Sequence, residues 1–168
     1  CGVIMSISTI DGALRVRGQL TCDSFVLPAG TITDASVAAA AGIVSEKLEQ
    51  QYLPLFTQPN TTAAAETRVI HVVRGTTGTI EAFRAGSIAA NSGAAVVTVD
   101  LKKNGSSVLS SVITLDNANT ARVAEDGTIS SANVVAGDVL EVVITATAGG
   151  GTLATGVFAQ ACIQEKAD

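Results

Sequence analysis

Regular alternation of apolar and polar residues, broken by glycine-containing turns, is the sequence feature that most constrains the fold. In the segment 95–101, Val97, Val99 and Leu101 fall on one face of an extended chain. A period of two residues is typical of a β-strand with one buried face. The Lys-Asn-Gly sequence at 103–105 follows directly, and Asn-Gly is a strong hairpin signal.

The same pattern recurs along the C-terminal two thirds of the chain, with turn residues between the repeats. The predicted strands are 67–74, 79–84, 107–115, 121–123, 128–130, 139–146 and 153–163, and the predicted turns include 75–78, 125–127 and 148–151. Strands at short, regular spacing without intervening helical pattern favour a sandwich or barrel. We therefore predict an all-β fold, a jelly-roll-like β-sandwich of about eight strands, for residues 61–168.

The first 60 residues lack the regular alternation of the rest of the chain. Short strand patterns at 13–20 and 24–27 precede a run of small residues, which predicts helix confined to about 34–49. Two prolines and polar turn residues then predict an extended linker at 53–62. Because this stretch has little apolar bulk to offset its conformational entropy, we expect residues 1–60 to form an arm that orders only against another surface.

Composition excludes some functions and favours self-association. Charged residues are only 15% of the chain, hydrophobic residues are 47%, and the net charge is −5. Nucleic-acid binding is excluded because it needs clustered Lys and Arg to replace phosphate counterions. The longest apolar run, 37–44, is too short for a membrane span. So few charged side chains would cover the surface of a monomer poorly. We therefore expect part of that surface to be buried between subunits of a homotrimer.

No pattern of catalytic or metal-binding residues stands out. His71, the one histidine, lies mid-strand and favours a packing role, although a hydrolase with His71 as base stays open because catalytic partners need not be adjacent. Cys22, His71 and Cys162 lack the short spacings of a zinc site. The acidic stretches 116–119 and 125–127 do not match a calcium loop, and we predict turns there. No enzymatic activity, cofactor or metal is expected.

Two parts of the chain resemble bacteriophage structural proteins. The small-residue segment 32–48 is similar to a module of phage fibre and head-decoration proteins. Segments 97–105, 136–142 and 151–159 resemble the β-sandwich domain of such proteins. The resemblance implies a non-enzymatic virion protein on the capsid surface, a head fibre or cement protein, which binds the major capsid protein and often forms trimers.

The arm would carry the attachment in this interpretation. Its bulkier apolar residues are the candidate contacts to capsid or neighbouring subunits, namely Phe25, Ile32, Val37, Ile43 and Leu48. An alternative is a receptor- or carbohydrate-binding module of a tail fibre, in which loops of the same sandwich face a host surface. Exposed aromatic side chains or a calcium site in those loops would favour the alternative.

Overall fold

A computed structural model describes residues 49–166, which fall within one compact unit of the chain. The strands predicted at 13–20 and 24–27, and the helix predicted at 34–49, lie outside the described residues except for Glu49, which is part of a strand. In the described part the strands are β1 (Glu49–Tyr52), β2 (Leu55–Thr57), β3 (Glu66–Val72), β4 (Thr77–Ala89), β5 (Val96–Lys103), β6 (Ser106–Ser107), β7 (Ile113–Leu115), β8 (Ala124–Asp126), β9 (Asn133–Val135), β10 (Val139–Thr147) and β11 (Thr155–Lys166).

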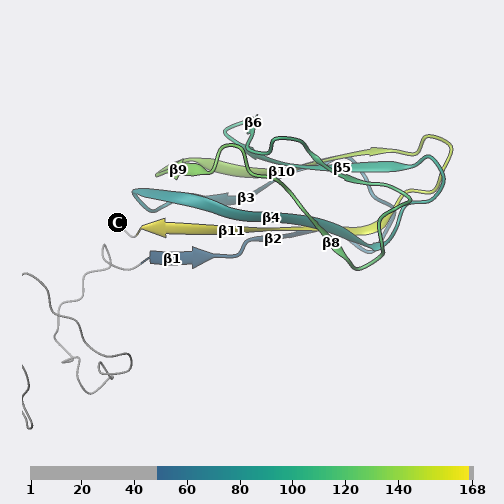
Figure 1. The fold of residues 1–168 in the computed structure, drawn as a ribbon, viewed down its shortest axis with the longest axis horizontal. Coiled ribbons are helices and arrows are strands. Elements are labelled where there is room, and N and C mark those ends of the chain that lie inside the picture. The colour runs from purple at the N-terminus through teal and green to yellow at the C-terminus, as the bar shows by residue number, and fades with distance from the viewer. Residues whose placement is uncertain (1–48, 167–168) are drawn as a thin grey trace, which may run out of the picture. The chain divides into compact units, whose positions relative to one another are not determined.

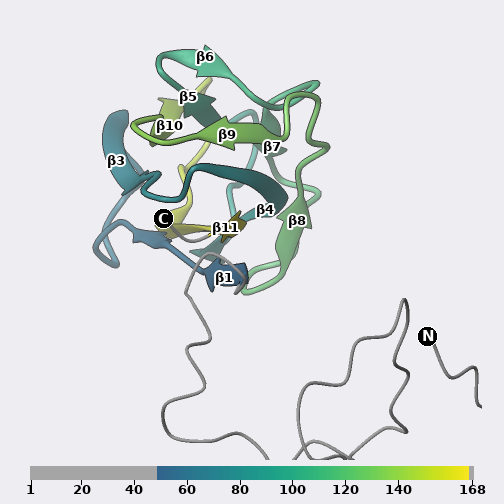
Figure 2. The same ribbon diagram turned by 90° about the vertical axis from the view of Figure 1, so that its left-hand side faces the viewer.

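The strands form two antiparallel sheets that face each other (Figure 1). Sheet A has the order β1-β11-β4-β8, with β2 also on β11 and β9 also on β4. Sheet B has the order β3-β10-β5-β6, with β7 also on β5. Figure 2 views the strands end-on, with β3, β10 and β5 in one layer and β1, β11 and β4 in the other.

The topology is that of a jelly roll. The pairs β1/β2, β6/β7 and β8/β9 each share one partner strand, so each pair is a single strand with an interruption. Counting each pair once leaves eight strands, which lie in the chain order 1-8-3-6 in sheet A and 2-7-4-5 in sheet B. This is a long hairpin rolled up into two sheets, the jelly-roll arrangement. The predicted all-β sandwich is therefore confirmed.

The core lies between the inner faces of the two sheets. It contains Phe83 and Ile163 from sheet A and Leu101 and Leu140 from sheet B, all fully buried. Alternation explains this, because every second residue of each central strand points inward. Each such side chain contributes about 1.5–3 kcal/mol relative to an exposed one.

The first strand of the jelly roll precedes residue 60, where the arm was expected to end. β2 lies inside the predicted linker 53–62, and its Phe56 is fully buried in the core. Pro54 interrupts the strand, which is tolerated because proline lacks an N–H and this strand is at an edge. The Pro54 carbonyl still accepts a hydrogen bond from Ala161 N at 3.2 Å. Residues 61–168 alone would therefore lack one edge of sheet A.

Several short segments differ from the prediction. Residues 124–126, assigned in part to a turn, form β8, whereas 121–123 is not a strand. The predicted strand 107–115 is divided between β6 and β7, and 128–130 contributes only an isolated bridge. β9 was not predicted. Segments of two or three residues are too short to show a period, and their partner strands hold them in place.

A bulge in the pairing of β3 with β10 changes the orientation of its side chains. The register pairs His71 with Leu140 but Val69 with Glu141, which is the next residue along β10. Consecutive strand residues point to opposite faces, so His71 points toward the core side and Val69 outward. Without the bulge, the alternation of a regular strand would place both residues on one face.

Candidate functional site

The first and the last described residues lie side by side at one end of the sandwich. The antiparallel register pairs Glu49 at the start of β1 with Lys166 at the end of β11 (Figure 1). The 48 residues that precede β1 are therefore attached beside the last strand. We call this the arm-root end of the sandwich.

A buried carboxylate joins three parts of the chain at the arm-root end. Glu165 of β11 is 2% exposed and accepts a hydrogen bond from His71 Nε2 at 2.5 Å. It also accepts hydrogen bonds from the backbone N–H of Gly75 at 2.8 Å and of Arg74 at 3.1 Å. These contacts connect sheet A with β3 of sheet B and with the loop between β3 and β4. We call this group the Glu165 cluster.

The cluster keeps its carboxylate ionised. Burial raises the pKa of Glu165, but the hydrogen bonds from Gly75, His71 and Arg74, together with the charge of His71, outweigh this effect. The pKa of Glu165 therefore lies below its ordinary value. A buried carboxylate with three donors is satisfied, and removing it would leave those donors without an acceptor.

Tyr52 connects β1 to the cluster. Its ring lies 5.0 Å from the His71 ring, centroid to centroid, at an interplanar angle of 41°. His71 is thus held between the Glu165 carboxylate and the Tyr52 ring, and the Tyr52 hydroxyl donates to Gln50 Oε1 at 2.5 Å. In these contacts His71 links β3 to β11 and to β1.

Close backbone approach at this end explains Gly75. A Cβ at position 75 would lie 2.2 Å from the Lys166 carbonyl oxygen and 2.9 Å from Glu165 Cβ. Only glycine lets the β3–β4 loop come near enough to donate its N–H to the Glu165 carboxylate. The glycine at 75, predicted as part of a turn, is therefore also a requirement of the cluster.

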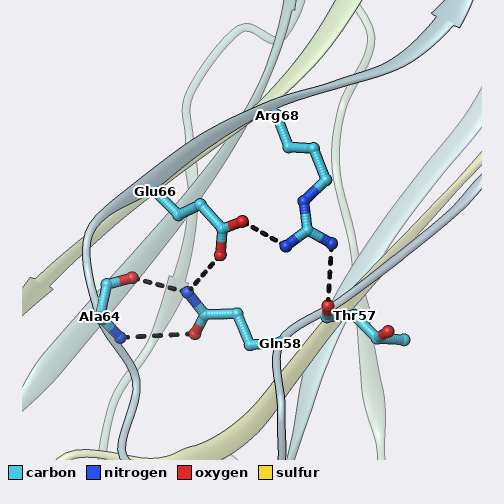
Figure 3. A network of polar contacts seen from close by, with 5 residues as sticks. All are labelled: Thr57, Gln58, Ala64, Glu66 and Arg68. Carbon is cyan, nitrogen blue, oxygen red and sulfur yellow. Dashed lines mark hydrogen bonds and ion pairs between the residues drawn. The ribbon is translucent and has the colours of Figure 1, made fainter.

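A second polar network closes the sandwich between β2 and β3 (Figure 3). Arg68 contacts Glu66, donates to the Thr57 carbonyl at 3.2 Å, and lies 4.7 Å from the centre of the Phe56 ring. Gln58 donates to Glu66 at 3.0 Å and to the Ala64 carbonyl at 2.7 Å. Inward-pointing charges on an edge strand oppose pairing with another sheet. This network therefore opposes the pairing of another sheet with the two neighbouring edge strands, β2 of sheet A and β3 of sheet B.

A pocket of about 450 Å³ lies on sheet A near the arm-root end. Three neighbouring strands line it, and the lining residues are Thr77, Gly78, Thr79, Asn133, Val134, Val135, Gln164, Glu165 and Lys166. Glu165 and Val134 are buried and turned toward the core, whereas Thr77, Asn133, Val135 and Lys166 are exposed. Thr79, Asn133 and Gln164 alternate with inward-facing neighbours such as Val134 and Glu165, so this part of the lining lies on the outer side of sheet A.

The predicted contact residues of the arm, Phe25, Ile32, Val37, Ile43 and Leu48, lie outside the described residues, as does Cys22. Cys162 is a half-buried thiol, 3.1 Å from Gln51 Nε2, and far in the chain from His71. Within residues 49–166 no group of three or more potential metal ligands comes together. In the same residues no helix is long and apolar enough to cross a membrane.

The stretch 116–119 folds as the sequence predicted. Asp116 accepts a hydrogen bond from Ala118 N at 2.8 Å, and Asn119 accepts one from Asp116 N at 2.6 Å. These side chains bond their own backbone and stabilise a turn. Glu125 and Asp126 are instead on β8, where Asp126 pairs with Arg84 and Glu125 accepts from Asn119.

Glu165 and the lining of the pocket were not identified from the sequence. One signal was present: in β11 the inward positions are Val157, Ala159, Ala161 and Ile163, and Glu165 continues their period. An acidic residue at an inward position needs a partner. The pocket has no comparable signal, because its strands are far apart in the chain.

Comparison with known proteins gives little. No protein-family model matches the sequence, and no curated protein matches it. Among solved structures, a chain of Desmodium yellow mottle tymovirus aligns with 95% of this chain and 96% of its own length, at 10% identity and a TM-score of 0.30. A likeness this distant carries no argument about the role of the present chain.

Proposed function

We propose that the protein is a non-enzymatic structural protein of a phage virion, held on the capsid surface by the residues that precede β1. The observation that carries the proposal is the pairing of Glu49 with Lys166. It joins the 48 preceding residues to one end of a jelly roll, and in this proposal the opposite end, with the loops 90–95 and 148–154, points away from the capsid. The sequence resemblance of segment 32–48 to phage modules supports the same division of roles.

The proposal includes a partner and an assembly state. The partner is the major capsid protein, contacted by the aliphatic residues of the arm. The assembly is a homotrimer, as a chain with 15% charged residues suggests. Both a head fibre and a cement protein are consistent with a trimeric assembly. The polar sealing of the β2–β3 edge supports a closed assembly rather than an open fibre of paired sheets.

The test compares the full chain with a truncation that respects the fold. Because β1 and β2 belong to the sandwich, the truncation should begin at residue 49 rather than after residue 60. The 49–168 variant is expected to fold, giving the same dispersed NMR spectrum in the sandwich, but to fail to bind capsids that lack the protein. The full chain is expected to bind them in co-sedimentation.

A matched control separates attachment from folding. A third variant, 62–168, removes β1, β2 and Phe56 and is expected to lose the cooperative unfolding transition. If the 49–168 variant binds capsids as tightly as the full chain does, the arm does not carry attachment. Light scattering of the full chain at micromolar concentration then tests the trimer, and a monomer mass would contradict it.

A further inference from the structure

The outer side of sheet A carries a row of neutral hydrogen-bonding side chains across four strands. The register pairs Gln51 of β1 with Gln164 of β11, Gln164 with Thr79 of β4, and Thr79 with Asn133 of β9. Directly paired residues on one face have Cβ atoms about 4.5–5.5 Å apart. Three of these four residues line the pocket described above. We call the four the amide–hydroxyl row.

The charged residues of the lining argue against a cationic ligand. Glu165 is the one carboxylate of the lining, but it is turned to the core, where it accepts hydrogen bonds from His71, Gly75 and Arg74. A cationic ligand would therefore find no carboxylate in this lining. Lys166 is the one cation of the lining and offers only a point charge, without the bidentate geometry by which arginine binds phosphate or carboxylate groups.

The remaining lining matches a neutral, polyhydroxylated molecule. Threonine hydroxyls and the carboxamides of Asn and Gln both donate and accept hydrogen bonds, as sugar hydroxyls do. Val135, which is 52% exposed, adds an apolar surface for the C–H groups of a ring. The volume of about 450 Å³ falls within the roughly 300–1,000 Å³ of small-molecule sites.

We propose that this pocket binds neutral saccharides through Thr79, Asn133 and neighbouring polar groups of sheet A. No aromatic ring lines it, so the stacking that strengthens many sugar sites is absent from this lining. A single site should therefore be weak, with a Kd of about 1 mM or higher. The pocket lies near the arm-root end, away from the loops 90–95 and 148–154 that the virion role proposed above would project. The site itself does not depend on that role.

The test is an NMR titration of the full chain with defined sugars. The neutral probes are maltotriose, lactose, mannotriose and N-acetylchitotriose, and the charged comparison is glucose 6-phosphate. At least one neutral probe is expected to shift the backbone amide signals of Thr77, Thr79, Asn133 and Gln164 in a saturable way. Absence of such shifts with every neutral probe, or shifts there with glucose 6-phosphate alone, would overturn the proposal.

Variants separate the pocket from the rest of the surface. Thr79→Val combined with Asn133→Ala removes two hydrogen-bonding groups and should weaken binding by about tenfold or more, since about 1.4 kcal/mol corresponds to a factor of ten. Thr114→Val combined with Asn117→Ala, both exposed positions outside the pocket, is the matched control and should bind as the natural chain does.

Two further outcomes are decisive. If the pocket variant binds as tightly as the control variant, the site is wrong. Should the double variant fail to fold, Thr79→Val alone keeps the branched side chain and should still show a measurable loss of affinity; unchanged affinity there would also contradict the proposal. Capsid co-sedimentation is a separate measurement, so failure of one proposal does not imply failure of the other.

Discussion

The two ends of the sandwich are each fastened by a buried polar side chain, and the two differ in chemistry. At the arm-root end, Glu165 accepts three hydrogen bonds, one of them from His71. At the opposite end, the carboxamide of Asn91 donates to the Leu115 carbonyl at 2.8 Å and accepts from Ala154 N at 2.8 Å. Both side chains join segments that are distant in the chain.

The two side chains differ in whether they can be ionised and in which segment of the chain they hold in place. Asn91 cannot titrate, so the closure of the loops 90–95 and 148–154 does not depend on this side chain's protonation. Glu165 can titrate, and Tyr52 packs on its partner His71, so the strand that continues into the arm is coupled to an ionisable group. We infer that the arm-root end is the acid-sensitive end of the sandwich, and three predictions test this comparison.

The largest effect is expected from Glu165→Ala. The substitution leaves His71 and two backbone N–H groups without their acceptor in a buried place, and breaking a buried pair in this way costs about 3–5 kcal/mol of folding free energy. Urea unfolding would measure it. Arg84→Ala breaks the exposed pair with Asp126 and should cost about 0–1 kcal/mol. Equal losses of unfolding free energy in the two variants would show that the Glu165 cluster does not contribute more to stability than an exposed ion pair.

A smaller but clear loss is expected from Asn91→Ala. The Leu115 carbonyl and the Ala154 N–H lose their partners, and each unsatisfied buried group costs about 1–3 kcal/mol. Hydrogen exchange should show faster opening at the ends of β7 and β11 near the loops, while β1 keeps its protection. Loss of protection in β1 as well would mean that the two ends do not behave independently.

The third prediction concerns the dependence of stability on pH, where the smallest effect is expected. Because the pKa of Glu165 is lower in the folded state than in the unfolded chain, its contribution is fully present above the unfolded pKa of about 4.3. The contribution is lost as the pH falls through the lower, folded pKa. Thermal midpoints between neutral pH and about pH 3 should therefore fall less steeply in Glu165→Gln than in the natural chain.

A second carboxylate sets the background for that measurement. The hydrogen bond from Val135 N has the largest effect on the pKa of Asp138 and lowers it. Burial raises this pKa, but the hydrogen bond from Asn104 and the charge of Lys103 lower it further, so it lies below its ordinary value. Some acid dependence should therefore remain in Glu165→Gln, and Asp138→Asn should remove part of it. Asn91→Ala should keep the full slope. An unchanged slope in Glu165→Gln would show that the arm-root end is not acid-sensitive through this residue.

The long strands could be predicted from sequence because each carries its own period. The inward residues of β5 (Val97, Val99, Leu101) and of β10 (Leu140, Val142, Ile144) recur every second position. The turn at Asn104 and Gly105 adopts the positive φ values, 49° and 83°, that the Asn-Gly pair favours. β2 and β9 could not be found in this way. They are three residues long, and pairing with β11 and β4 defines them rather than any pattern of their own.

The candidate sites depend on contacts that no local pattern encodes. His71 and Glu165 are 94 residues apart, and the bulge in β3 that turns His71 inward has no sequence signature. The amide–hydroxyl row brings together residues from 51 to 164. Only the register of β1, β11, β4 and β9 aligns them, and register comes from the whole fold.

The antiparallel pairing of β1 with the end of β11 also determines how the domain would respond to a pull on its arm. A load directed along the strand axis, away from the arm-root end, acts on all the hydrogen bonds between Glu49–Tyr52 and β11 at once. They would have to break together in shear, rather than one after another as in unzipping. Behind them, Pro54 and then the buried Phe56 would have to slide past β11 before the strand came free. The first strand of the jelly roll is in this sense a mechanical anchor.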